Sequence, residues 1–171
     1  GDSLLNLALN NHQMALNFRQ QLGDQYGIAS SYNNLGNVYD IKGNFSEALK
    51  YHFASLKIKE ETGSQYGMIR SYGNIGNIYI ALKQYNEGKK WLNKSLDLSK
   101  ELGIKEAIKL CYGSLYLADS SLNNFESAFE NYKMYIFYRD SLINEENIGK
   151  IVELEMQYKF DKKLTADSLA N

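Results

Sequence analysis

The stretch "SYNNLGNVYDIKGNFSEAL" at residues 31–49 recurs forty residues later as "SYGNIGNIYIALKQYNEG" at residues 71–88. Both copies read Ser-Tyr-x-Asn-(Leu/Ile)-Gly-Asn-(Val/Ile)-Tyr, followed by an aromatic residue, Glu and a small residue. A fixed period of this length is typical of stacked repeats, in which each unit buries its apolar face against its neighbours. The alternative interpretation is a Gly-rich catalytic loop that is used twice.

The forty-residue period divides most of the chain into three full repeats, each of which begins at a glycine: residues 23–62, 63–102 and 103–142. Residues 3–22 match the second half of a repeat, so the array opens half a repeat early. We therefore expect a repeat array over residues 1–142 and a C-terminal capping or linker helix over residues 143–171.

Each repeat contains two apolar stripes with helical spacing, joined by a short break. The first stripe contains Ile28, Tyr32, Leu35, Val38 and Tyr39. The second contains Phe45, Ala48, Leu49, His52 and Leu56, with the copies Tyr85, Gly88, Leu92, Leu96 and Phe125, Ala128, Phe129, Tyr132, Ile136. With no proline to interrupt them, these stripes predict an all-α chain. We expect seven antiparallel helices up to residue 142 and an eighth that begins near Asn144.

Gly36 and Gly76 lie in the middle of the first helix of their repeats, where glycine costs about 1 kcal/mol relative to alanine. Close approach of a neighbouring helix would offset this cost. We expect the approaching group to be the aromatic residue that begins the second helix, Phe45 or Tyr85.

The pattern Tyr-x-x-(Leu/Ile)-Gly-x-x-Tyr, followed by Phe/Tyr and by Ala or Gly three residues later, resembles the tetratricopeptide repeat over residues 3–142. The forty-residue length resembles the longer-helix variety of kinesin light chains and bacterial peptide-sensing regulators. The resemblance implies an α-solenoid of stacked antiparallel helix pairs. The third repeat departs from the pattern, with Tyr116 in place of the glycine and Asp119 in place of the second tyrosine. We expect looser packing or a different neighbour there.

The C-terminal segment carries a ridge of Val152, Met156, Phe160 and Leu164, flanked by Ile148, Ile151, Leu154 and Tyr158. A helix that is apolar on more than one face either caps the array or pairs with a second copy of itself. The order Asp-Ser-Leu, Asn-Glu-Glu, Leu-Glu-x-x-Tyr also resembles the segment that follows such arrays in membrane-linked bacterial sensors. In those proteins it leads to a histidine kinase, nucleotide cyclase or DNA-binding output.

The composition excludes several classes of partner. The formal net charge is −1 and no basic stripe stands out, which argues against nucleic acid. No run of about 18 apolar residues is present, so we expect no direct membrane insertion of this segment. A single cysteine, Cys111, cannot form an internal disulfide.

The candidate chemical groups favour packing over catalysis. The "GNIGN" text lies on a predicted helix and lacks the strand and the Lys-Ser/Thr of a phosphate-binding loop. His12 and His52 occupy equivalent repeat positions without a recurring carboxylate or thiol, which favours packing over a metal site. Cys111 shows no activating neighbour and is interpreted as a buried, inert thiol.

The charged clusters have equally plain interpretations. The glutamate pairs 60–61 and 145–146 are interpreted as solvated helix ends, because adjacent helical residues point about 100° apart. Trp91, among Lys89, Lys90 and Lys94, is expected to pack between repeats. We therefore expect no catalytic residue, no metal and no cofactor; an enzyme would need a converging set of polar groups that the sequence does not offer.

What remains is the concave face, which the first helix of each repeat lines in the tetratricopeptide family. By resemblance, its candidate ligand-binding residues are Asn33, Asn34, Asn37, Asp40, Arg70, Asn74, Asn77, Leu110 and Leu117. Asparagine amides can pair with a peptide backbone, so an extended peptide is a suitable ligand. The alternative is that these asparagines bond between repeats or to water. The chaperone-tail type of module is disfavoured, because Arg70 is the only basic residue of the set.

The resemblance implies a non-catalytic sensing segment of a bacterial signal-transduction protein of the two-component type. Its partners would be a protein or an extended peptide, with a possible homodimer through the C-terminal helix. That helix would relay binding to an output domain outside this segment. The side of the membrane stays open, with the periplasm preferred to the cytoplasm. The alternative is a purely structural assembly or dimerisation scaffold.

Overall fold

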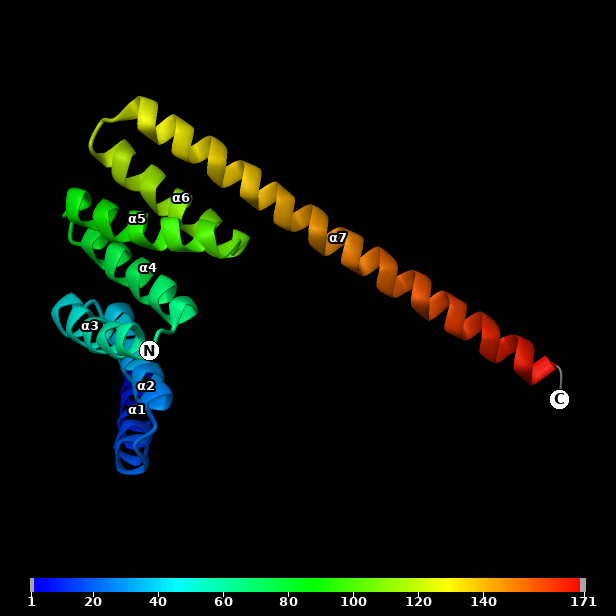
Figure 1. Cartoon of the computed structure of the whole chain (residues 1–171), viewed down its shortest axis with the longest axis horizontal. Coiled ribbons are helices and arrows are strands. Elements are labelled where there is room, and N and C mark those ends of the chain that lie inside the picture. Colours follow the sequence, from blue (N-terminus) through cyan, green and yellow to red (C-terminus); the bar gives the residue numbers. More distant parts are fainter. Residues whose placement is uncertain (1, 170–171) are drawn as a thin grey trace.

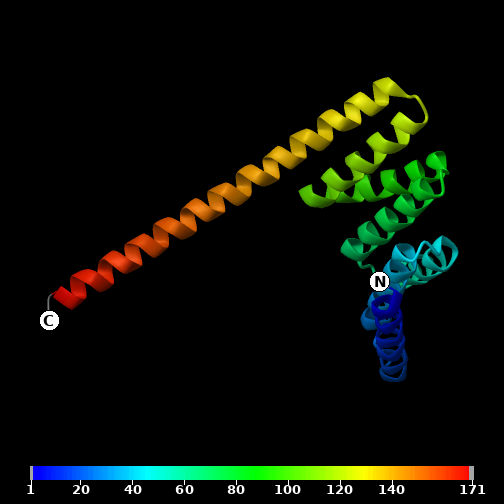
Figure 2. The same ribbon diagram turned by 180° about the vertical axis from the view of Figure 1, so that it is seen from behind.

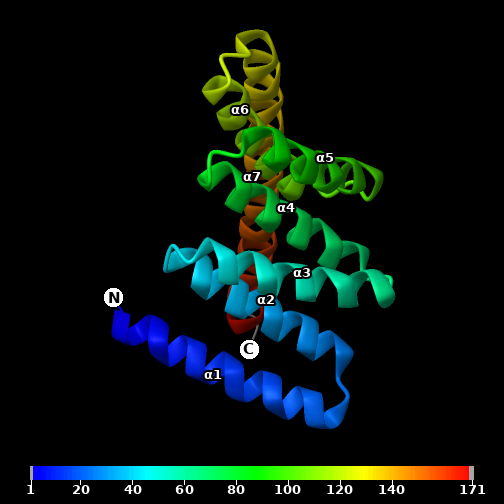
Figure 3. The same ribbon diagram turned by 90° about the vertical axis from the view of Figure 1, so that its left-hand side faces the viewer.

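The computed structural model describes the backbone of residues 2–169 and the side chains of residues 3–157, 159 and 160. This part of the chain is all-α and contains no strand. Its helices are α1 (Asp2–Leu22), α2 (Gln25–Ile41), α3 (Phe45–Glu61), α4 (Gln65–Ala81), α5 (Tyr85–Glu101), α6 (Lys105–Ser121) and α7 (Phe125–Leu169). They stack in chain order as the layers of an α-solenoid (Figure 3), as the repeat period predicted.

Left-handed residues end the helices and set the period. Gly23, Gly63 and Gly103 follow α1, α3 and α5 with φ between 67° and 69°, a conformation that costs glycine little. The next helix then begins at a polar cap: the Asp24 side chain accepts a hydrogen bond from the Gly27 N–H at 2.9 Å. The glycine stop signal therefore recurs every forty residues, whereas the side-chain cap does not: Ser64 and Ile104, at the equivalent positions before α4 and α6, make no side-chain cap hydrogen bond.

The first stripe of each repeat is buried as predicted. Ile28, Leu35 and Val38 of α2 are buried, and Ile75 and Ile78 are their counterparts in α4. Ile28 and Leu35 belong to a cluster of α1, α2 and α3, and Ile75 belongs to a cluster of α3, α4 and α5. The core is thus a row of clusters, each shared by successive helices, as expected of stacked helix pairs.

The second stripe is largely buried in the first two repeats, whereas in the third repeat Ala128 is buried but the aromatic residues of the stripe are exposed. Ala48, His52 and Leu56 are buried in α3, whereas Phe125 and Phe129 of α7 are 69% and 61% exposed. The residues at the position of Phe129 in earlier repeats reach the next helix pair: Leu49 packs in the cluster of α4, and Lys89 binds Asp119 of α6. Since no described helix follows α7 in the stack, the predicted burial of Phe125 and Phe129 is wrong.

Close approach of the helices explains the mid-helix glycines, with a different partner from the one predicted. A Cβ on Gly36 would lie 2.8 Å from the His52 imidazole, and a Cβ on Gly76 would lie 2.7 Å from Leu92. The crossing point is therefore the middle of the second helix, not Phe45 or Tyr85 at its start. Antiparallel helices joined by a three-residue turn bring residues about seven positions either side of that turn together.

The expected separate eighth helix does not exist, because α7 runs unbroken from Phe125 to Leu169. Ile143 occupies the period position at which Gly23, Gly63 and Gly103 end their helices. A β-branched residue disfavours the left-handed conformation that glycine adopts there, so the helix continues. The last repeat, residues 103–142, and the C-terminal segment are thus joined by a single continuous helix.

The second half of α7 leaves the array, as the two opposite views agree (Figures 1 and 2). Every described side chain from residue 143 to 157 is exposed, so this part does not lie against the last repeat. Before it leaves, α7 contacts Lys105, at the start of α6, through Ser141 and Glu145. The predicted ridge residues Val152, Met156 and Phe160 are exposed; the side chains of Tyr158 and Leu164 lie outside the described residues. None of the helices in the described part combines the length and apolarity needed to cross a bilayer.

Candidate functional site

A groove of three adjoining pockets follows the first helices of the repeats. The basic pocket, about 190 Å³, lies between α2 and α4 and is lined by Tyr26, Ala29, Ser30, Asn33, Asn34, Lys59, Thr62, Ser64, Tyr66, Gly67 and Arg70. The middle pocket, about 210 Å³, is lined by Ile69, Arg70, Gly73, Asn74, Asn77, Leu92, Ser95, Ala107, Leu110, Cys111 and Ser114. The aromatic pocket, about 370 Å³, is lined by Leu110, Gly113, Ser114, Tyr116, Leu117, Tyr132 and Tyr135. Shared lining residues make the groove continuous: Arg70 joins the first two pockets and Leu110 the last two.

The structure brings most of the predicted groove residues together. Seven of the nine line these pockets: Asn33, Asn34, Arg70, Asn74, Asn77, Leu110 and Leu117. Asn37 and Asp40 line none of the three. Asp40 is half-buried, and burial raises the pKa of its carboxyl group.

Three of the predicted asparagines bind one another across the first two repeats. The Asn74 amide nitrogen donates to the side-chain oxygens of Asn33 and Asn37, at 3.2 Å each. Asn33 is also buried. The alternative that the asparagines bond between repeats is therefore correct for these three side chains. Asn34 and Asn77 make no such bond among the described residues. Sequence pattern alone could not separate the two sets, because the distinction depends on the reach of Asn74 from α4 to α2.

Lys59 is the groove residue that the sequence interpretation missed. Its side chain is 92% buried at the end of α3, and its ammonium donates to the Ser71 hydroxyl at 2.9 Å. No described carboxylate forms an ion pair with it. Burial, with a smaller contribution from the charge of Arg70, lowers the pKa of the ammonium to about 8. A buried cation without a counter-ion is therefore held beside the basic pocket.

A repeated pair of residues makes room for this cation and could have identified it. A Cβ on Gly67 would lie 2.8 Å from the Lys59 side chain, so the glycine provides the space that the long side chain occupies. One repeat earlier, Gly27 stands in the same relation to Arg19, whose guanidinium donates to the Gly27 carbonyl at 3.1 Å. A long basic residue followed by glycine eight positions later is the sequence signal.

The opposite end of the groove is aromatic and apolar. The ring centroids of Tyr116 and Tyr132 lie 5.2 Å apart, and Leu110 and Leu117 are more than half exposed. Glycine leaves the floor open: a Cβ on Gly113 would lie 3.3 Å from the Tyr135 ring. Side chains of α6 and α7 thus form a surface suited to large apolar groups.

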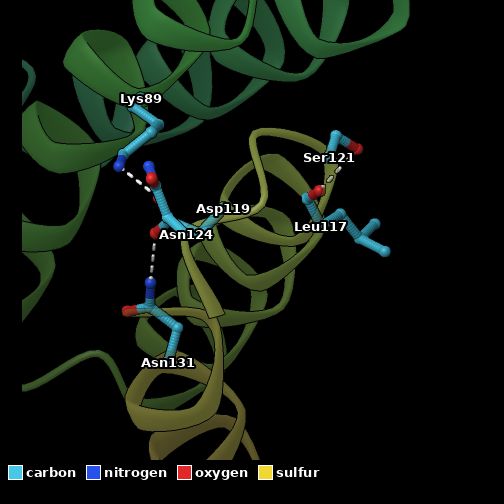
Figure 4. Close-up of polar contacts among 6 residues, drawn as sticks. All are labelled: Lys89, Leu117, Asp119, Ser121, Asn124 and Asn131. Atoms are coloured by element: carbon cyan, nitrogen blue, oxygen red, sulfur yellow. Dashed lines mark hydrogen bonds and ion pairs between the residues drawn. The ribbon is translucent and has the colours of Figure 1, made fainter. Parts of the chain in front are cut away.

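Asp119 joins the last three helices from the interior (Figure 4). Its carboxylate is almost fully buried and accepts hydrogen bonds from Lys89 of α5 and from the Asn131 amide of α7, the latter at 2.9 Å. Asn124, in the connecting turn, donates to it at 3.4 Å. Ser121 does not take part, because its hydroxyl donates to the Leu117 carbonyl at 2.8 Å. The different neighbour expected for Asp119 is thus Lys89, and the role of the carboxylate is structural.

The remaining candidate groups take packing positions. Cys111 is buried, and burial raises the pKa of its thiol, as expected of an inert cysteine. Trp91 lies between repeats as predicted, with ring centroids 5.4 Å from Phe53 and 5.9 Å from Tyr72. The glutamates of the pairs 60–61 and 145–146 are exposed. In the described part of the chain, no three side chains of His, Cys, Asp or Glu come together to hold a metal.

His52 is buried against Gly36, and its imidazole has a strongly lowered pKa. Its side chain is 1% exposed, and its Nδ1 has no hydrogen-bond partner among the described residues. Burial, followed by the positive charge of Lys59, lowers the pKa of the imidazole to about 4. The ring is therefore a neutral packing element at physiological pH, as the sequence favoured.

Comparisons with known proteins agree on the fold. Residues 28–62 and residues 69–102 each match a family model described as tetratricopeptide repeat. A search of curated proteins finds no match to this sequence.

Similar solved structures are repeat proteins of greater length. Aspartyl phosphate phosphatase F from Bacillus subtilis is 12% identical with a TM-score of 0.77, covering 81% of this chain and 36% of that one. BtubC from P. vanneervenii is 16% identical with a TM-score of 0.70, covering 82% of this chain and 59% of that one. A Rap protein complexed with Competence and Sporulation Factor is 18% identical with a TM-score of 0.56, covering 82% and 48%. The chain therefore spans less than two thirds of each of these three neighbours, and these likenesses concern the fold alone.

Proposed function

We propose that this tetratricopeptide repeat array is a non-catalytic binding segment that holds an extended peptide in its groove. The observation that carries the proposal is the continuity of the three pockets from α2 to α7, with polar groups at one end and apolar groups at the other. Extended peptides suit such a surface, because backbone groups can pair with exposed amides while side chains fill separate pockets. The neighbour that is complexed with Competence and Sporulation Factor supports this ligand class by analogy of fold.

The same geometry supports a sensing role in bacterial signal transduction. Tyr132 and Tyr135 of the aromatic pocket belong to α7, which continues without a break to Leu169. A peptide that changes the packing of these rings therefore moves the helix that leaves the array. We take α7 as the relay to an output domain outside this segment, since a rigid helix transmits a small displacement over its whole length.

A structural assembly role is the second candidate, favoured by the exposed apolar side chains of Ile148, Ile151 and Leu154. On this account two copies of α7 pair through residues 143–157. Replacing Ile148 and Ile151 together with Glu should then convert a dimer to a monomer in sedimentation equilibrium without lowering the melting temperature of the array. A wild-type chain that is monomeric at high micromolar concentration would dismiss this role.

The binding function is tested with an unbiased array of synthetic nonapeptides and the labelled full chain. We expect a subset of peptides to bind and, when added in solution, to raise the melting temperature in proportion to the logarithm of their concentration. Leu117→Glu places a charge in the aromatic pocket at an exposed position. It should lower the affinity for these peptides while leaving the fold intact. Failure of every peptide to bind wild-type protein would contradict the proposal.

A further inference from the structure

The groove is chemically polarised along its length. The basic pocket contains the only two cations that line the groove in the described part of the chain, Lys59 and Arg70. The aromatic pocket at the other end contains none; Leu110, Leu117 and three tyrosines line it. A ligand that fits both ends must therefore differ along its own length.

Neither cation of the basic pocket is neutralised by the protein. The exposed guanidinium of Arg70 forms no ion pair or hydrogen bond with another described residue. The buried ammonium of Lys59 has three N–H donors, but only the Ser71 hydroxyl accepts from it. Burying a charge without a counter-ion destabilises a fold by several kcal/mol as an order of magnitude. An incoming anion would supply the missing partner.

Equivalent positions of the other repeats show that this arrangement is specific to the first full repeat, residues 23–62. Arg19, one repeat earlier, satisfies its guanidinium with the Gly27 carbonyl and the Ser31 hydroxyl. One repeat later the position is Ser99, whose hydroxyl donates to the Ser95 carbonyl at 2.6 Å. Packing of the repeat thus does not require a cation here. Arg139, in the third repeat, forms an ion pair with Asp140. Of the cations at these positions only Lys59 is buried, and it has neither a carboxylate nor a second hydrogen-bond acceptor among the described residues.

From this arrangement we infer that the groove selects a peptide with a carboxylate at one end and large apolar side chains at the other. The carboxylate lies in the basic pocket, between Lys59 and Arg70, and the apolar side chains lie in the middle and aromatic pockets. This inference rests on the proposed peptide-binding function and adds to it a ligand class and a direction: the acidic end faces α2 and the apolar end faces α7. The carboxylate can belong to a glutamate or aspartate side chain or to the C-terminus of the peptide.

The test uses the full chain and three matched nonapeptide arrays. Every peptide contains two leucines and one test residue, which is glutamate in the first array, glutamine in the second and lysine in the third. Within each array the separation between the test residue and the leucines is varied. We expect the glutamate array to bind at least tenfold more tightly than the glutamine array, and the lysine array to bind weakest. Peptides with a free or an amidated C-terminus separate a terminal carboxylate from a side-chain carboxylate. Equal binding of the glutamate and glutamine arrays, with no effect of amidation, would overturn the inference and leave the proposed function standing. Absence of binding in all three arrays would also overturn the inference, and the unbiased array then decides whether the proposed function stands.

A variant pair separates binding from folding. Lys59→Met keeps a buried aliphatic side chain and removes the charge. It should therefore lower the affinity for glutamate peptides at least tenfold, while the melting temperature stays equal or rises. Lys57→Met, on the exposed side of the same helix, is the control and should change neither quantity. If Lys59→Met melts lower than wild type and binds glutamate peptides unchanged, the ammonium is a structural group and the inference is wrong.

Discussion

The first two repeats and the third follow the same period but close their helix pairs in opposite ways. In the first two, a glycine lets the helices meet: Gly36 against His52 and Gly76 against Leu92. In the third repeat, Tyr116 replaces the glycine and its ring packs beside Tyr132. The period fixes the path of the chain, while the residue at this one position decides whether the space between the helices is closed core or an open pocket.

The first and third repeats also differ in the buried contact made by the residue at the position of Tyr39. Tyr39 of the first repeat stacks on Tyr51, with ring centroids 5.5 Å apart. The third repeat has Asp119 at the position of Tyr39, and its carboxylate binds Lys89 and Asn131 instead. The third repeat is therefore held by a buried polar contact where the first uses aromatic stacking, and its tyrosines are left available to line the groove.

The largest expected effect comes from filling a closed crossing. Gly76→Leu should destabilise the array by about 3 kcal/mol, because a Cβ already meets Leu92 and the Gly88 carbonyl at 3.1 Å or less. Tyr116→Leu, at the equivalent position of the third repeat, has no such obstacle and should cost much less. Urea unfolding followed by circular dichroism measures both. A more stable Gly76→Leu variant would mean that close approach is not why glycine stands there.

A smaller effect, on pH dependence, tests the crossing in the first repeat. The pKa of His52 is lowered to about 4 in the folded chain, so below pH 6.5 the unfolded state binds more protons than the folded state. Stability therefore falls with falling pH, by about 1 kcal/mol between pH 6.5 and 5.5. Leu92 occupies the same position one repeat later, so His52→Leu imports a residue that this crossing accepts. That variant should lose the histidine contribution in this pH range; identical pH profiles for both proteins would contradict the assignment.

The sequence predicted the repeat path well because its signals are local. Glycine at every fortieth residue and two stripes per repeat determine six of the helices. Ile143, in place of a fourth glycine, also carried the information that α7 continues, but the composition of the following segment pointed to a separate helix. Counting outward from the turn at residues 42–44 would have placed the middle of the second helix, near Lys50 and His52, opposite Gly36.

The candidate site was less predictable, because it depends on side chains from different helices. The resemblance located the face, and seven of its nine residues line the groove. Whether an asparagine is exposed or bound to its neighbour depends on the separation of α2 and α4, as the bonds of Asn74 to Asn33 and Asn37 illustrate. Lys59 was missed because it belongs to the second helix of its repeat, which the family pattern does not place on the concave face.

The most direct test of the groove is isothermal titration of the tightest array peptide into the Gly73→Ala variant, with a thermal melt of the same sample. A Cβ at Gly73 lies 3.7 Å from the nearest atom, the Ser95 hydroxyl oxygen, so alanine fits the helix while occupying the floor of the middle pocket. Gly149→Ala on the exposed part of α7, where a Cβ meets nothing within 4 Å, is the control and should bind the peptide as wild type does. Better helix propensity should stabilise Gly73→Ala by up to about 1 kcal/mol, while the affinity for the peptide falls several-fold. Unchanged affinity in a variant that melts higher than wild type would show that the peptide does not occupy this groove.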